Sequence, residues 1–260
     1  MIQPEAPGDR TRPRSRTRPG PVEQRPHAGM SVRQRAWARV GASPATTAYL
    51  LVLVGVHLVL DHVLTARAAA SAEQYLSTNL DNLEDHPLLA LLGSGLVVDS
   101  PLGHPFTLAF GGTLITLVAG ITVVLAALER RYGTARACGV LAAGHIGATL
   151  LVAPVIALAI AHGWYPASLR AAHDVGISYG AEAVLACATF TLVRGRAARV
   201  LWAVAVLAWP LAGVAWTMRL PDFTTIGHLT AAAIGFALGL LMSSTLPRGR
   251  GARCAPRVRP

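Results

Sequence analysis

Runs of apolar residues alternate with short polar segments along most of the chain, and six of these runs approach the length that crosses a bilayer. A helix rises about 1.5 Å per residue, so roughly 20 residues cover a hydrocarbon layer of about 30 Å. Water cannot satisfy backbone amides inside lipid, so the pattern predicts an all-α membrane protein with six transmembrane helices. The runs, of which the fourth and fifth are short, span residues 45–64, 106–128, 137–161, 176–193, 200–217 and 226–246.

The pattern divides the chain into a membrane domain, residues 45–246, and two polar tails. Residues 1–44 are rich in Arg and Pro, which predicts a disordered tail, and residues 247–260 form a second basic tail. Inside the membrane domain, residues 65–105 mix leucines with Asp and Glu, which predicts short helices lying in the outer membrane interface. A simple surface loop is the alternative for that segment.

Composition agrees with a membrane protein, and charge orients it. The chain is 53% hydrophobic and 14% charged. Twenty of its 23 arginines lie in the two tails and in the loops 129–136 and 194–199. Cytoplasmic loops retain positive charge, so we expect both termini on the cytoplasmic side and the more acidic alternate loops outside. The chain has no lysine, which suggests a GC-rich bacterial genome and hence a bacterial plasma membrane.

The formal net charge of +10 also raises the alternative of nucleic-acid binding. The arginine-rich tail, however, is interrupted by prolines and has a single aromatic residue, Trp37. A disordered tail that sets topology and lies against anionic lipid headgroups fits these features better. The sequence therefore predicts the lipid bilayer as a partner and no nucleic acid.

Small residues recur every fourth position in two of the predicted helices. The sixth has Gly227, Ala231, Gly235 and Gly239, and the fourth has Gly176 and Gly180. Such rows allow close approach of helix backbones. Ordinary bundle packing is a sufficient explanation, but the rows give the fourth and sixth helices a face by which to meet.

Ser178 and His228 lie at matching depths in those two helices, each about one turn inside the expected outer end. Ser178 falls in a first helical turn, where unpaired amides and the helix dipole favour developing negative charge on a substrate oxygen. A serine hydroxyl is a weak nucleophile unless an imidazole takes its proton. The pair predicts a catalytic Ser-His dyad, which requires the two side chains to come within hydrogen-bond reach.

These residues resemble the motifs of the rhomboid family of intramembrane serine proteases. Residues 176–178 match the Gly-x-Ser motif of the family, His228 matches its sixth-helix histidine, and residues 128–134 match the Leu-Glu-x-x-x-Gly-Ser/Thr signature after the second helix. The resemblance covers residues 45–246. It implies a six-helix core, no metal or organic cofactor, and a single-pass transmembrane protein as substrate.

Two departures from the family pattern concern the reacting centre. A second-helix His-x-x-x-Asn motif usually helps to form the oxyanion hole, and here those positions hold Thr113 and Leu117. Thr113, Gly176 and the Ser178 amide are the remaining oxyanion candidates, and His104 is a further substitute. The usual glycine after the serine is Tyr179, whose ring is expected to narrow or block the cleft.

The third departure is Glu182, four residues after Ser178 and therefore on the same helix face. The family commonly has an aromatic ring there, stacked on the histidine. A carboxylate at this depth is costly in lipid and needs a partner or a water-filled cavity. Two interpretations stay open: Glu182 orients His228 in a Ser-His-Glu arrangement, or it is a protonated structural side chain.

Four other polar residues raise the alternative of a metal site. His57 and Asp61 share a helix face, while His62 and His145 lie elsewhere. Without a His-Glu-x-x-His motif, interhelical hydrogen bonding is the favoured interpretation, and no metal is expected. Asp174, just before the Ser178 helix, is expected to cap it.

The sequence thus favours an intramembrane serine protease. The main alternative is a non-catalytic rhomboid-like protein that binds transmembrane helices, which the missing second-helix donors and Tyr179 favour. A transporter that uses Glu182 and His145 as a proton relay is a weaker third, because the sequence shows no obvious inverted repeat.

Overall fold

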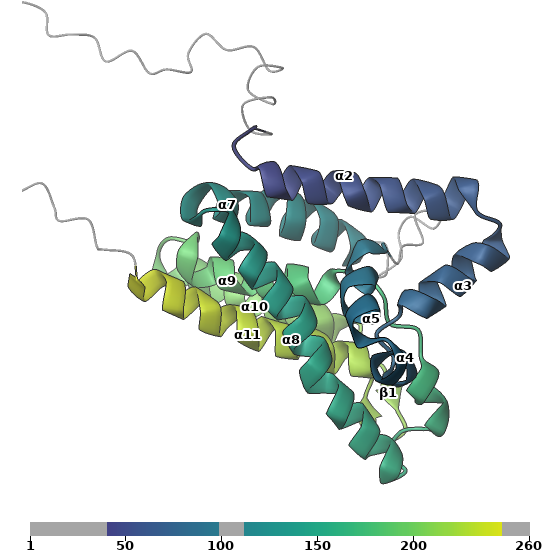
Figure 1. Ribbon diagram of the computed structural model, residues 1–260. Helices are drawn as coiled ribbons and strands as arrows, with labels where there is room; N and C mark the ends of the chain where they lie inside the picture. Colours follow the sequence, from purple (N-terminus) through teal and green to yellow (C-terminus); the bar gives the residue numbers. More distant parts are fainter. Residues whose placement is uncertain (1–40, 99–111, 246–260) are drawn as a thin grey trace, which may run out of the picture. The chain divides into compact units, whose positions relative to one another are not determined.

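The structure, a computed structural model, describes residues 41–98 and 112–245, and most of them are helical (Figure 1). His104, residues 1–40 of the first tail and residues 246–260 lie outside the described residues. A short antiparallel ribbon of β1 (Trp216–Thr217) and β2 (Leu220–Pro221) joins the last two helices. The helical elements are α2 (Pro44–Leu58), η1 (Val59–Val63), α3 (Ala66–Leu76), α4 (Leu80–Asp85), α5 (Pro87–Gly93), η2 (Ser94–Leu96), η3 (Ile115–Leu125), α7 (Ala126–Tyr132), α8 (Thr134–Ala161), η4 (Ala167–Ala171), α9 (Ser178–Thr191), α10 (Arg196–Ala212) and α11 (Phe223–Thr245).

Four stretches of described helix are long and apolar enough to cross a membrane. They correspond to the first, second, third and sixth predicted spans. The other two predicted spans correspond to α9, with 14 residues, and α10, with 17. Twelve of the α9 residues are buried by neighbouring helices, so this helix contacts protein along most of its surface. The four long stretches are Pro44–Val63, Gly112–Tyr132, Thr134–Ala161 and Phe223–Ser244.

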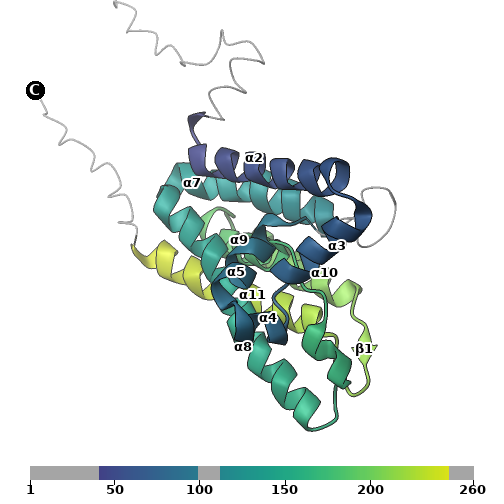
Figure 2. The same ribbon diagram turned by 45° about the vertical axis from the view of Figure 1, so that its right-hand side comes forward.

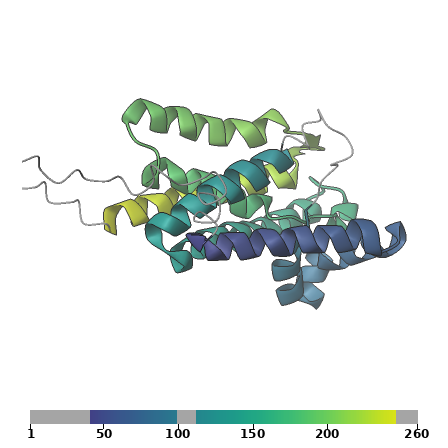
Figure 3. The same cartoon turned by 90° about the horizontal axis from the view of Figure 1, so that it is seen from above.

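Helix α9 packs against α8, α11 and η3 through small residues. Gly144 of α8 and Gly235 of α11 both face Ala183, and Gly120 of η3 faces Ala181. A Cβ at Gly239 would come within 2.6 Å of the Cys187 carbonyl oxygen. The small residues of the sixth predicted helix therefore contact the fourth, whereas Gly180 of the fourth faces Leu141 of α8. Seen from above, α10 lies on one side of the molecule, and α2 lies with the α3–α5 segment on the other (Figure 3).

The segment 128–134 links three helices through one buried carboxylate. Glu129 accepts hydrogen bonds from the amides of Ala45 and Thr46, at 3.0 and 2.9 Å, at the start of α2. The hydroxyls of Thr46 and Thr134 donate to the same carboxylate at 2.7 and 2.9 Å. Gly133, with φ of 89°, makes the turn that ends α7 and starts α8, a backbone conformation that side chains with a Cβ rarely adopt. The motif is thus a joint between α2, α7 and α8.

The segment after η1 forms α3, α4, α5 and η2, of which α4 and α5 lie beside α8 (Figure 2). Asn79 caps α4, because its side-chain oxygen accepts from the Asn82 amide at 2.9 Å. Leu80 is buried, whereas Leu88 and Leu92 are exposed. Short helices thus form over residues 66–96, and their position in the membrane interface stays a prediction.

Candidate active site

A cavity of about 410 Å³ lies at the N-terminal ends of α9 and α11, and both Ser178 and His228 line it. Ser178 is the first residue of α9, and His228 lies in the second turn of α11. Both side chains are half-buried. The structure therefore places the two predicted dyad residues in one cavity.

The His228 ring has a defined hydrogen-bond partner on one side. Its Nδ1 lies 2.8 Å from the backbone carbonyl oxygen of Thr224, one turn earlier in α11. A carbonyl can only accept, so Nδ1 carries the proton and Nε2 of the neutral ring holds a lone pair. This tautomer is the one that lets Nε2 accept a proton.

The two dyad residues share the cavity without a bond between them. Among the described residues, no hydrogen bond joins the Ser178 hydroxyl to the His228 imidazole. Catalytic hydrogen bonds are often long in enzymes without substrate and shorten when substrate binds. Ser178 and His228 thus share one cavity, but this structure does not show the hydrogen bond by which His228 would activate the Ser178 hydroxyl.

The oxyanion candidates differ in what they can offer. The Gly176 amide donates to the Ser94 carbonyl at 2.8 Å, so it is already engaged and does not serve as a free donor. The Ser178 amide lies in the first turn of α9, where helix amides lack intrahelical acceptors. Thr113 and Leu117 both line the cavity, so the second-helix positions that the family resemblance identified share it with Ser178. A hydroxyl and an apolar side chain thus stand where two polar donors are usual.

Tyr179 does not line the cavity, and the expectation that its ring blocks the cleft is wrong. Successive helix residues diverge by about 100°, so a neighbour of a cavity residue points elsewhere. The Tyr179 ring is buried, packs edge-on against the His228 ring with centroids 4.9 Å apart, and covers Gly227. The tyrosine therefore supports the histidine from the side.

Glu182 is 3% exposed and does not line the cavity. Within the described part of the chain, its Oε1 has no hydrogen-bond partner, and no hydrogen bond links it to His228. The Nδ1 position that an orienting carboxylate would use is taken by the Thr224 carbonyl. The bond that a Ser-His-Glu arrangement requires is thus not seen.

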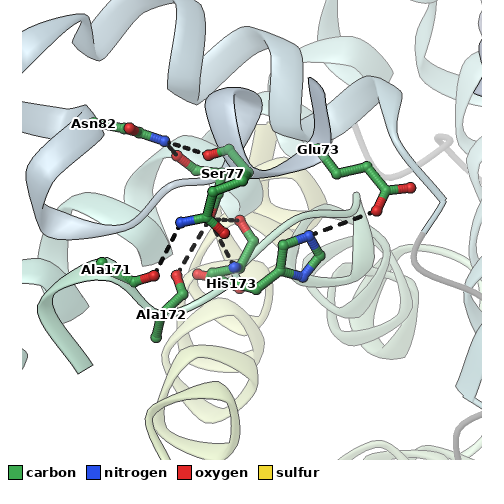
Figure 4. Close-up of polar contacts among 8 residues, drawn as sticks. Glu73, Ser77, Asn82, Ala171, Ala172 and His173 are labelled. Atoms are coloured by element: carbon green, nitrogen blue, oxygen red, sulfur yellow. Dashed lines mark hydrogen bonds and ion pairs between the residues drawn. The ribbon is translucent and has the colours of Figure 1, made fainter. Parts of the chain in front are cut away.

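Asp174 holds the segment before α9 instead of capping that helix, whose N-cap is Ile177. The Asp174 amide donates to the Ser77 hydroxyl at 2.8 Å, and the Thr78 hydroxyl donates to the Asp174 carboxylate at 3.1 Å. Figure 4 shows this contact region, in which Ser77 meets the segment that contains Ala172, and the His173 ring lies 3.9 Å from the Glu73 carboxylate. These bonds thus hold the segment that precedes Ser178 against the connection between α3 and α4.

Asp222 is a cavity residue that the sequence analysis did not select. Its carboxylate accepts from the Ala215 amide at 3.0 Å, from the Thr225 amide at 2.9 Å and hydroxyl at 2.8 Å, and from the Thr224 hydroxyl. Burial acts to raise the pKa of Asp222, but these hydrogen bonds outweigh burial and lower it. An Asp followed three residues later by Thr, directly before an apolar helix, is an N-cap pattern that would have identified it.

The remaining polar candidates make structural contacts. His145 Nε2 lies 3.1 Å from the Ser94 hydroxyl and 3.0 Å from the Leu91 carbonyl oxygen, which links α8 to the α5–η2 segment. His57 lies 3.4 Å from Asp61 on the same helix. In residues 41–98 and 112–245, no three His, Cys, Asp or Glu side chains gather as a metal site would require.

Comparison with known proteins agrees with these motifs. A family model described as rhomboid-like protein matches residues 38–248, which is most of the chain. Neither the curated proteins nor the solved structures gave a match. With its apolar helices, this match makes the chain an integral membrane protein. The chain belongs to the rhomboid-like protein family.

Proposed function

We propose that this protein is an intramembrane serine protease that uses Ser178 as nucleophile and His228 as general base. The observation that carries the proposal is the shared cavity: Ser178 begins α9 there, and His228 lines it with Nδ1 fixed to the Thr224 carbonyl. That arrangement leaves Nε2 to take the serine proton.

In the proposed reaction, the Ser178 oxygen bonds to the scissile carbonyl carbon while His228 Nε2 accepts the hydroxyl proton. The Ser178 amide, at the positive end of the α9 dipole, stabilises the oxyanion, and the Thr113 hydroxyl is the second donor. The protonated His228 then passes its proton to the departing amine as the peptide C–N bond breaks. A water molecule, deprotonated by His228, cleaves the acyl-enzyme and restores Ser178.

The proposed substrate is a single-pass transmembrane protein whose helix unwinds to place an extended segment in the cavity. We propose six spans, with α9 and α10 as the fourth and fifth, and both termini on the cytoplasmic side of a bacterial plasma membrane. Buried positions along α9 support its role as a span, because a helix covered by protein needs little contact with lipid. A reporter fused to either terminus should lie on the cytoplasmic side, and a reporter inserted within residues 213–222 should lie on the outer side. Any other pattern would reject this topology.

The decisive experiment compares cleavage of a model transmembrane substrate by the reconstituted wild type, Ser178→Ala and His228→Ala. We expect each variant to lose at least about 1,000-fold in rate, as serine hydrolases do when a dyad member is removed. Ser71→Ala and His162→Ala, at exposed sites on α3 and after α8, are matched controls that should cleave normally. Labelling of Ser178 by a fluorophosphonate should disappear in Ser178→Ala. Unchanged cleavage in either dyad variant would reject the mechanism.

A second candidate function is non-catalytic binding of transmembrane helices. Two observations favour non-catalytic binding. The side chains of Ser178 and His228 are not hydrogen-bonded to each other, and Leu117 lines the cavity at a position where the family usually has a polar donor. A wild-type protein that crosslinks to a transmembrane segment, yet neither cleaves it nor reacts with a fluorophosphonate, would support binding over proteolysis.

A further inference from the structure

We propose that Asp222 is the acidic positioning residue of His228 and that it acts through Thr224. The inference rests on the proposed function for its catalytic meaning, although the effect on the imidazole itself is measurable without catalysis. Asp222, Thr224 and His228 all line the same cavity.

Two hydrogen bonds to different groups of Thr224 connect the carboxylate to the ring. His228 Nδ1–H donates to the Thr224 carbonyl at 2.8 Å, and the Thr224 hydroxyl donates to the Asp222 carboxylate. Thr224 is thus held through its side chain while its carbonyl receives the imidazole. Since the carbonyl position depends on the backbone of the first turn of α11, the carboxylate that anchors this turn also sets the orientation of the ring.

The same carboxylate is anchored independently of His228. The Ala215 amide, before β1, and the amide and hydroxyl of Thr225 all donate to it at 2.8 to 3.0 Å. Four donors hold the carboxylate in one place, so its charge has a fixed position relative to the ring. A fixed negative charge stabilises the imidazolium that forms when Nε2 takes the serine proton.

No cation neutralises this charge among the described residues. Arg219, in the turn between β1 and β2, makes no ion pair with Asp222 in the described part of the chain. The other titratable groups near the ring are Tyr179, packed edge-on against it, and Asp174, which the Tyr179 hydroxyl contacts at 3.4 Å. Glu182 lies on α9, without a hydrogen bond to the ring. Asp222 is therefore the acidic group with a hydrogen-bonded route to His228.

The test removes the negative charge of Asp222 while nearly keeping the shape of its side chain. In Asp222→Asn, the acidic limb of the kcat/KM pH profile should move to lower pH by roughly half to one unit, because a negative charge near the imidazole is gone. We also expect kcat to fall by about tenfold or more and KM to change less. Asp222→Glu, which retains the charge, should keep the acidic limb near its wild-type position. Thr224→Val should lower kcat without moving the limb, since it breaks the link but leaves the carboxylate.

Thr225→Val is the matched control for the network. It removes a hydroxyl bond to the same carboxylate but keeps the negative charge, so the acidic limb should stay in place. If Asp222→Asn cleaves with the wild-type pH profile and kcat, the proposal is overturned.

A measurement that needs no activity separates this proposal from the proposed function. The ¹⁵N spectrum of the His228 ring, recorded against pH in detergent micelles, reports its tautomer and its titration midpoint. A midpoint that moves down in Asp222→Asn and stays in Thr225→Val supports the positioning role even if the wild type cleaves nothing. An unchanged midpoint and tautomer in folded Asp222→Asn overturns it, whatever the protease assay shows.

Discussion

Two glutamates of this protein are almost equally buried, yet their surroundings are opposite. Glu129, 4% exposed, accepts four hydrogen bonds and joins α2 to α7 and α8. Glu182, 3% exposed, has an Oε1 with no partner among the described residues. Burial alone therefore does not tell whether a carboxylate holds a membrane fold together. The partners decide, because a buried polar group stabilises only when its hydrogen bonds are made.

The largest expected effect is that of Glu129→Leu. It leaves the Ala45 amide and the buried Thr46 amide without their acceptor, so we expect a loss of about 3 kcal/mol or more in unfolding free energy. Denaturant unfolding in detergent, followed by tryptophan fluorescence, measures this loss.

The control for Glu129→Leu is Glu84→Leu, at an exposed site, which should change stability little. If Glu129→Leu were as stable as the wild type, the joint would not matter for stability. Should the variant fail to express, Glu129→Gln gives the graded comparison.

A smaller effect is expected for Thr134→Val, which removes one of the four donors to Glu129. The loss should be about 1 kcal/mol, the usual net value of one hydrogen bond, or somewhat more because the acceptor is ionised. Thr122→Val is a suitable reference, since its exposed hydroxyl bonds only to its own helix. Equal stability of the two variants would mean that Thr134 does not contribute through Glu129.

Glu182→Leu should change the free energy of unfolding by less than about 1 kcal/mol, or even raise it, because an unpaired buried carboxyl is replaced by an apolar side chain. Thr189→Val, which removes another buried hydroxyl without a partner among the described residues, should behave alike. The same unfolding assay measures both. A loss above about 2 kcal/mol in Glu182→Leu would show that the carboxyl makes a bond that this structure does not contain.

The smallest effect is expected in catalysis, for Glu182→Gln. If Asp222 positions His228, kcat/KM should stay within about threefold of the wild type, since a change that small is below 1 kcal/mol. Substrate cleavage by the folded variant provides the measurement. A tenfold or greater loss would restore the Ser-His-Glu arrangement and weaken the case for Asp222.

Several features could be predicted because they depend on position along a helix. The four long apolar helices, the close contact of Gly235 with α9, and the arrival of Ser178 and His228 in one cavity all follow from spacing and depth. Segment 128–134 was recognised as a motif. Its physical role as a joint centred on Glu129 became evident only with the contacts in view.

Other features depended on how the helices are rotated against one another. The sequence placed Tyr179 in the cleft, Asp174 at a helix cap and Gly176 among the oxyanion donors, and the tertiary contacts gave each a different partner. A helix's periodicity fixes which residues share a face but leaves open which neighbour that face meets. By itself the sequence determined the membrane class and the helical segments, and it placed Ser178 and His228 at matching positions near the ends of their helices. The tertiary structure alone decided that Ser94 accepts the Gly176 amide and that Ser77 binds Asp174, because these segments are far apart in the sequence and meet only after packing.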